Sequence, residues 1–327
     1  MTESALIILA VFAALFGLMV FLDIKKAKKR GEKYHFRQAL TAFLLLLPAC
    51  VLAYFFILLP ILYSLGYSFT NYNFLKPSKI QWVGIENFVT AFEEITSGGK
   101  LAMAIRNTSI FVVLVVPLQI GLALLLALFC NVKAKGNFIF KVCFFTPVVV
   151  SLAVTSYLWL QLLAPAKTSF MNSIFGLFGI PPQDFLNNPD TTMLWIVIVS
   201  AWQGCGYQML IFLSGLTGIK KELYEAARMD GCNVFGRFFK VTLPGLRPTM
   251  LYVLITVFIG ACRIMVQPWL MVGYQDNSVT LSYYMYQEGY SYKHVGYSAA
   301  IALLMTIFIG SITLIQKKVL GGKGNER

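Results

Sequence analysis

Long apolar segments, bounded by charged or turn-forming residues, recur along the whole chain. A helix needs about 20 apolar residues to cross a bilayer, and these segments are close to that length. The pattern predicts an all-α polytopic membrane protein, with a core of six spanning helices and one extra N-terminal helix. We expect the spans at Ala5–Leu22, Ala39–Tyr63, Ser109–Cys130, Val142–Leu163, Met193–Leu213, Thr249–Leu270 and Tyr297–Ile315.

The basic residues are concentrated in every second connection between these spans. Of the 27 Lys and Arg residues, 20 lie in segments 23–38, 131–141, 214–248 and 316–327. Cytoplasmic loops carry the excess of basic residues, so the N-terminus is expected outside and the C-terminus in the cytoplasm of the cytoplasmic (inner) cell membrane. This distribution accounts for the net charge of +13. Membrane lipid is therefore the partner that the charge implies, and no nucleic acid is expected.

Composition supports the membrane class, because 58% of the 327 residues are hydrophobic and only 13% are charged. The first span is followed by the basic run 25–30 and preceded by no basic residue, which is the reverse of a cleavable signal peptide. We therefore expect an N-terminal anchor helix and basic cytoplasmic linker over residues 1–38. Residues 39–327 would form the transmembrane domain, with a cytoplasmic loop at about 214–248.

Three predicted outer segments have different characters. In the first, Phe88, Ala91 and Phe92 follow helical spacing, which predicts a short amphipathic helix at the interface. The second, Ala164–Thr192, is rich in Pro, Asn and Gly and is expected to form turns with little regular structure. The third, Met271–Gly296, has six tyrosines. Anchoring at the membrane boundary and contact with a sugar or a docking protein both remain open for them.

The inner segment 214–248 is too long for a simple helix connection. Leu223, Ala226 and Ala227 have the spacing of one small apolar helical face, and Asp230-Gly231 is a strong helix stop. Asn233 can cap a second short helix. Such a helix–turn–helix could enter a groove on a cytoplasmic partner, or it could lie at the interface without a partner.

Polar and aromatic residues inside the spans are candidates for contact with a solute. No span contains Asp or Glu, which argues against a proton-coupled carrier, and Arg263 is the charged residue within a span. Inserting an Arg costs about 2.5–3.5 kcal/mol, so Arg263 should face a cavity or a partner, unless it snorkels or binds a carbonyl. On a continuous helix Gln267 shares its face. The path candidates are Trp202, Gln203, Tyr207, Arg263, Gln267 and Trp269, beside Gln208, with core packing as the alternative.

A resemblance to a known family follows from the inner segment. Glu225-Ala226-Ala227, then Gly231, then Val241-x-Leu243-Pro244 resembles the EAA loop of ABC-importer permeases. The similarity extends over nearly the whole chain after residue 40 and is strongest to carbohydrate-type permeases, on the side of the maltose-type first permease subunit. Other matching stretches are 83–88, 144–147 and 226–231. After the sixth span the chain has Gly273-Tyr274-Gln275-Asp276, where members often carry a Gly-Gly-Pro turn.

The resemblance implies a translocation subunit that is not an enzyme. Its partners would be a second homologous permease, two ATPase subunits and an extracellular or periplasmic solute-binding protein. The implied ATPase-coupling residues are Leu223, Glu225, Ala226, Ala227, Asp230 and Gly231. ATP and Mg²⁺ would bind to the partners, because this chain has no phosphate-binding G-x-x-x-x-G-K-[ST] motif.

Two other functional classes are alternatives to the ABC-importer permease. A secondary carrier or channel would need no ATPase, and the inner loop would then be only interfacial. A membrane-embedded enzyme lacks support, because no paired carboxylates or Cys/His group lies near the membrane. The six cysteines and two histidines have no metal-ligand spacing, so no metal site is expected.

Overall fold

The computed structural model describes residues 36–132 and 136–321, together with Val20 and Lys25. The predicted anchor helix Ala5–Leu22 and most of the basic linker lie outside the described residues. The chain divides into two compact units, residues 1–66 and 67–327. In the described part of the chain the structure is helical and has no strand, apart from isolated bridges joining Thr70 to Trp82 and Asn73 to His294, which confirms the all-α prediction.

The first unit contains one long apolar helical stretch. It consists of α2 (Phe36–Ala53), the π-helical turn η1 (Tyr54–Leu58) and α3 (Leu59–Tyr67). The wide turn ends two residues before Pro60, which has no N–H to donate to the helical hydrogen-bond ladder. Residues Leu40–Tyr67 are long and apolar enough to cross a membrane, in agreement with the predicted second span.

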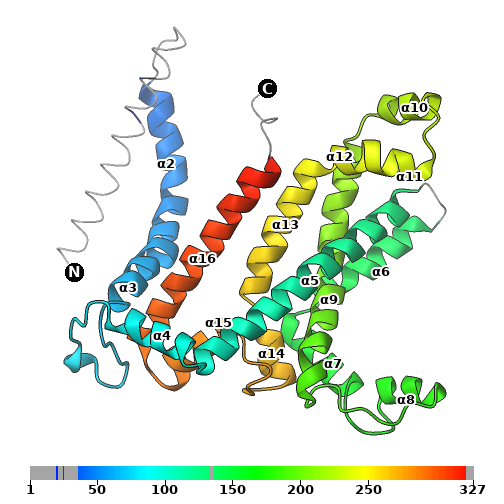
Figure 1. Ribbon diagram of the computed structural model, residues 1–327. Helices are drawn as coiled ribbons and strands as arrows, with labels where there is room; N and C mark the ends of the chain where they lie inside the picture. Colours follow the sequence, from blue (N-terminus) through cyan, green and yellow to red (C-terminus); the bar gives the residue numbers. More distant parts are fainter. Residues whose placement is uncertain (1–19, 21–24, 26–35, 133–135, 322–327) are drawn as a thin grey trace. The chain divides into compact units, whose positions relative to one another are not determined.

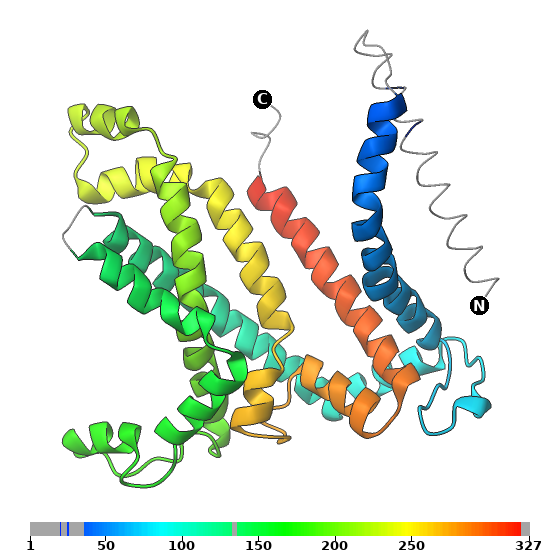
Figure 2. The same cartoon turned by 180° about the vertical axis from the view of Figure 1, so that it is seen from behind.

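Four helices form the centre of the second unit (Figures 1 and 2). Helix α9 packs along α5, and α13 packs against both α5 and α16. Small residues such as Ala123 and Ala127 allow the close contact with Met209 and Phe212 in the shared core. The bounds are α5 (Lys100–Asn131), α9 (Pro189–Thr217), α13 (Arg247–Cys262) and α16 (Val295–Gly321).

Two predicted spans are not continuous helices. The span expected at Val142–Leu163 is broken into α6 (Asn137–Val149) and α7 (Leu152–Leu162), which meet at 100°. The expected continuity of Thr249–Leu270 was also wrong, because α13 ends at Cys262 and α14 (Val266–Met271) starts after a gap. Proline 268 cannot donate to the carbonyl of Ile264, and Thr280 Oγ1 donates to that oxygen instead at 2.6 Å.

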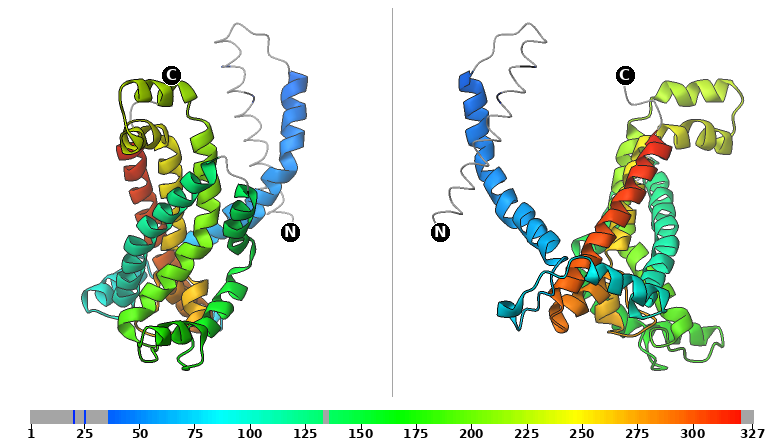
Figure 3. Two further views of the ribbon diagram at one scale, coloured as in Figure 1. Left: turned by 90° about the vertical axis from the view of Figure 1, so that its right-hand side faces the viewer. Right: turned by 60° about the vertical axis from the view of Figure 1, so that its left-hand side comes forward.

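The short elements lie at two opposite ends of the second unit, as the views in Figures 1 and 3 show. The α10 end holds α10 (Lys221–Met229), α11 (Val234–Arg237), η3 (Phe238–Thr242) and α12 (Leu243–Gly245). The α15 end holds η2 (Pro77–Lys79), α4 (Glu86–Thr96), α8 (Phe170–Leu177), α14, α15 (Leu281–Tyr286) and η4 (Gln287–Ser291). Helix α4 confirms the amphipathic helix, whereas α8 corrects the expectation of mere turns in 164–192: Asn172, in this helix, binds backbone carbonyls on both sides of it.

In the described residues, four helices pass as membrane spans by length and apolar character. Two bent pairs, α6 with α7 and Val234–Gly245 with α13, raise the number to six if each pair counts as one span. Six agrees with the six-helix core that the hydrophobic pattern predicts.

Candidate coupling loop and transport pathway

Helix α10 ends in a compact turn built on Gly231. The N–H of Cys232 donates to the Ala227 carbonyl at 2.9 Å, and the N–H of Gly231 donates to the Arg228 carbonyl at 3.1 Å. Gly231 has φ +75°, the left-handed conformation that this pattern of helix ending requires. Asn233 Oδ1 then accepts from the Gly236 N–H at 2.7 Å and caps α11. The predicted stop and the predicted cap are both present.

The inward side of α10 includes one residue of the predicted apolar face. Ala227 is buried, and the hydroxyl of Tyr224 lies 3.0 Å from Thr242 Oγ1 in η3. Leu223 and Ala226 are exposed, so of the three residues on the predicted apolar face Ala227 is the one buried within the described chain. The packed face of α10 is centred on positions 224 and 227, because α10 packs mainly against α11 and η3.

The outward side of α10 combines apolar and charged groups. Leu223 is half-exposed, and Met229 is 88% exposed at the end of the helix. Glu225, Arg228 and Asp230 are also exposed. Exposed apolar side chains between charges are typical of surfaces that contact a partner.

A chain of glutamine side chains connects the two interrupted helices. Gln203 of α9 donates from Nε2 to the Val150 carbonyl at 3.3 Å, in the break between α6 and α7. Its Oε1 accepts from Gln267 Nε2 of α14 at 3.1 Å, and Gln267 Oε1 accepts from the Ser200 hydroxyl. The amide groups of Gln203 and Gln267 and the hydroxyl of Ser200 each take part in these hydrogen bonds, which hold the three side chains in fixed orientations.

Two cavities adjoin this chain of side chains. One, of about 450 Å³, lies at the α6–α7 break and is lined by Val148, Val149, Val150, Ser151, Leu152, Ser200, Gln203, Gly204 and Gln267. The other, of about 280 Å³, is lined by residues of α5, α7, α9, α13, α14 and the segment between α13 and α14. Its polar lining consists of Gln119, Ser200, Gln208, Thr256, Arg263 and Gln267. Such spaces with a few oriented polar groups are typical of solute sites.

Arg263 does not occupy a helical face, contrary to the expectation. It is the residue that ends α13, where its N–H donates to the Gly260 carbonyl at 3.2 Å. The helix is interrupted before Gln267, so the i to i+4 relation between them is lost. Both residues nevertheless line the smaller cavity, together with Gln208.

The three aromatic candidates lie apart from these cavities. Trp202 is partly exposed and contacts Trp159 edge-on, with ring centroids 5.6 Å apart. Tyr207 is half-exposed, and Trp269 lies 5.7 Å from the Tyr286 ring. None of the three is among the described residues that line either cavity.

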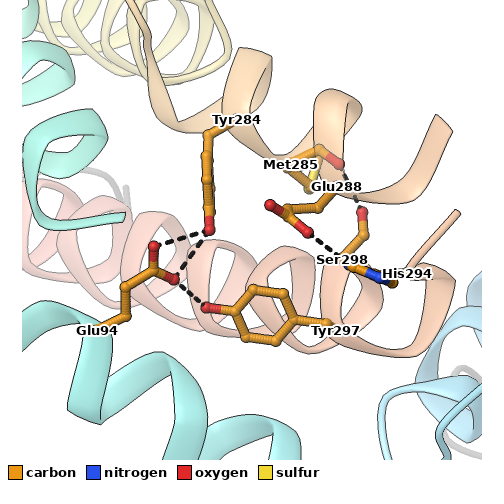
Figure 4. Close-up of polar contacts among 7 residues, drawn as sticks. All are labelled: Glu94, Tyr284, Met285, Glu288, His294, Tyr297 and Ser298. Carbon is orange, nitrogen blue, oxygen red and sulfur yellow. Dashed lines mark hydrogen bonds and ion pairs between the residues drawn. The ribbon is translucent and has the colours of Figure 1, made fainter. Parts of the chain in front are cut away.

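A carboxylate cluster at the α15 end was missed by the sequence reasoning (Figure 4). Glu94 of α4 accepts from the Tyr284 hydroxyl at 2.9 Å, from the Tyr297 hydroxyl at 2.6 Å and from the Leu101 N–H at 3.2 Å. Burial and the nearby Glu94 raise the pKa of Tyr284, so its hydroxyl stays a neutral donor. In the sequence, Glu94 lies beside the apolar face formed by Phe88, Ala91 and Phe92, so the hydrophobic pattern predicts a surface residue.

Two of the six tyrosines in segment 271–296 are core residues and not anchors. Tyr283 and Tyr284 are each 2% exposed and pack with Ala91, Leu101 and Ile301. Burial raises the pKa of Tyr274 to about 12. Tyr290 is more exposed, and the Lys293 ammonium lies 4.7 Å from its ring centroid. The tyrosines of this segment therefore do not share one role.

Comparison with known proteins places the chain in a family. Residues 5–321 match the family described as the inner membrane component of binding-protein-dependent transport systems. An arabinooligosaccharide transport permease of Bacillus subtilis (strain 168) is 35% identical over 81% of this chain and 84% of its own length. A trehalose/maltose transport permease of Thermococcus litoralis is 27% identical over 88% of this chain and 96% of its own length.

A solved structure has the same fold. It is a bacterial alginate ABC transporter in complex with a periplasmic protein that holds an alginate pentasaccharide. The matching chain has a TM-score of 0.75 and 21% identity, and the match covers 86% of this chain and 94% of that one. With the family match over almost the entire sequence, this chain belongs to the inner membrane components of binding-protein-dependent transport systems.

Proposed function

We propose that this chain is the permease subunit of an ABC importer for a sugar or oligosaccharide in the cytoplasmic membrane. It would pair with a second homologous permease and two ATPase subunits, and receive solute from a solute-binding protein outside. The relatives named for arabinooligosaccharides and for trehalose and maltose support the substrate class. The observation that carries the proposal is α10, an exposed and well-anchored helix at the basic end of the chain.

The connections of α10 suit a coupling role. Its N-terminal side follows α9 directly, and its C-terminal side leads through α11, η3 and α12 into α13. Both α9 and α13 line the smaller cavity. Tyr224 and the turn at Gly231 fix α10 to this framework, so a push on its exposed side would be transmitted to the walls of the cavity. We assign ATPase contact to Leu223, Glu225, Ala226, Asp230 and Gly231, with buried Ala227 supporting the helix from within.

The two cavities are the proposed route for the solute. Sugar hydroxyls need donors and acceptors held in place, and the amides of Gln203 and Gln267 are held by their mutual hydrogen bond. Arg263 adds a cation to the same space. Trp202, Tyr207 and Trp269 would contact solute only if a partner subunit completes the route beside them.

ATP and Mg²⁺ are assigned to the partner subunits. The chain has no sequence motif that could cradle ATP phosphates. Its own task would be mechanical, since α10 receives the motion of the ATPase dimer and the cavity walls change their accessibility. A secondary carrier would instead depend on an ion gradient.

The turn at Gly231 supplies the first test. A valine there is strained by about 1–2 kcal/mol in the left-handed conformation, so Gly231→Val should reduce ATP-driven sugar uptake at least about tenfold without reducing membrane insertion. Gly179, with φ +74° and equally open surroundings, gives the matched control Gly179→Val outside the loop. Equal losses in both variants would remove the coupling role from α10.

The energy source supplies the second test. Uptake into vesicles should continue when the proton gradient is collapsed and ATP is held constant. Loss of uptake under these conditions would favour the secondary carrier over the ABC importer.

A further inference from the structure

The lining of the smaller cavity carries a positive charge and no negative charge. Arg263 is the charged residue among the described residues that line either cavity, and none of these lining residues is Asp or Glu. In the described part of the chain, His294 forms an ion pair with Glu288 at the α15 end. Arg263 forms no ion pair with a described carboxylate. The Arg263 side chain is exposed in the described chain, so its guanidinium is open to an anion or to acceptors that enter the cavity.

An unused acceptor lies in the same cavity. Gln208 is only 8% exposed, and its buried Oε1 has no hydrogen-bond partner in the described structure. A buried acceptor without a partner is destabilising, and it is expected to bind a donor that enters the cavity. Gln203, Gln267 and Ser200 are bound to each other, and the Thr256 hydroxyl donates to backbone carbonyls of its own helix. Gln208 and Arg263 therefore remain open to a guest, with Gln119 beside them in the cavity lining.

We propose that the solute of this permease is an anionic sugar, whose oxyanion binds to Arg263 while a hydroxyl donates to Gln208 Oε1. The proposal rests on the proposed function and specifies its substrate class. Guanidinium groups bind carboxylate and phosphate through paired hydrogen bonds, so either anion satisfies the chemistry. Arg263 would thereby determine the selection between charged and neutral sugars, because the cavity offers no acid to compensate it.

The test compares three sugars that share the same ring configuration and differ in charge: galactose, galacturonate and galactose 6-phosphate. Equilibrium binding is measured on the complete transporter with its partner subunits in nanodiscs, without ATP and without solute-binding protein. We expect at least about tenfold tighter binding of one or both anionic sugars than of galactose. Which of the two binds distinguishes a carboxylate from a phosphate. The preference should decrease at high salt.

Variants separate the roles of the two residues. Arg263→Gln should weaken the binding of the anionic sugars more than that of galactose and so remove the anionic preference, while Arg263→Lys should keep part of it. Gln208→Leu should weaken the binding of all three sugars by a similar factor. Arg106 is exposed on α5 and lines neither cavity, so Arg106→Gln is the matched control and should keep the preference.

Three results would overturn the inference: galactose bound as tightly as both anions, an anionic preference that survives in Arg263→Gln, or no binding of any sugar at millimolar concentration. Galactose binding without anionic preference would leave the proposed sugar permease standing. Failure of the permease itself would appear separately, as uptake that no longer depends on ATP.

Discussion

At the scale of single residues, two tyrosines of segment 271–296 show how hydrogen bonding decides the effect of burial. Tyr284 donates to both oxygens of Glu94 at 2.9 Å. The buried hydroxyl of Tyr274 has no hydrogen-bond partner in the described chain. A bond to a charged acceptor stabilises by about 1.5–3 kcal/mol, whereas an unpaired buried hydroxyl is destabilising. The same residue type therefore has opposite effects within one segment.

This difference predicts the outcome of two phenylalanine substitutions. Tyr284→Phe should lower the free energy of unfolding by about 1.5–3 kcal/mol, because Glu94 loses one of its donors. Tyr274→Phe should leave it unchanged or raise it slightly. Denaturant unfolding in detergent micelles measures both. Similar losses in the two variants would contradict the assigned hydrogen bonds.

At the scale of secondary structure, helix α9 connects the breaks in two other spans. Gln203 binds the Val150 carbonyl between α6 and α7 and also binds Gln267 of α14. Gly206 lies so close to α6 that a β-carbon there would clash with the Phe144 carbonyl oxygen. Side-chain bonds and close backbone approach thus hold α9 against the interrupted helices, which suits a helix that forms a cavity wall.

The first prediction at this scale concerns Gln203. Gln203→Leu should cost about 1–3 kcal/mol of stability and reduce uptake, because the Val150 carbonyl and the Gln267 amide lose their partner. Gln161 is exposed on α7, so Gln161→Leu serves as the control and should have little effect. Thermal unfolding and uptake are measured together. Unchanged stability in Gln203→Leu would show that the two breaks do not depend on this contact.

The second prediction concerns the approach of α9 to α6. Gly206→Ala should destabilise the protein by about 1–3 kcal/mol, since the backbone of α6 must move. Gly121 is inside α5 with open space around it, and Gly121→Ala should instead stabilise by up to about 1 kcal/mol. Opposite signs in the unfolding midpoint are expected, and a loss in both variants would contradict the packing.

At the scale of the whole molecule, the second unit has two ends with different chemistry. The α10 end carries the basic residues of segment 214–248 and the exposed side of α10. The α15 end carries the amphipathic α4, the short α8 and the tyrosine-rich segment. The positive-inside rule predicts that the α10 end faces the cytoplasm and the α15 end faces the outside.

Cysteine labelling tests this orientation. Met229 is 88% exposed at the α10 end and Leu177 is 83% exposed at the α15 end. With Cys50, Cys143 and Cys232 replaced by serine, an impermeant maleimide should label Leu177→Cys in right-side-out vesicles. Met229→Cys should react in inverted vesicles only. The reverse pattern would place the α10 end outside and exclude contact with a cytoplasmic ATPase.

Hydrophobic periodicity and charge distribution were sufficient for the helical class, the six-span core, the helix stop at Gly231 and the cap at Asn233, because each depends on local sequence or on transfer into the bilayer. The breaks at Val150 and Arg263 were not predictable, because a carbonyl freed in mid-span is stabilised only by a distant donor such as Gln203 or Thr280. The bonds of Glu94 to Tyr284 and Tyr297 likewise join residues about 200 positions apart. Sequence thus determined which segments enter the membrane, and tertiary contact decided where they break and which polar groups remain free in the cavity.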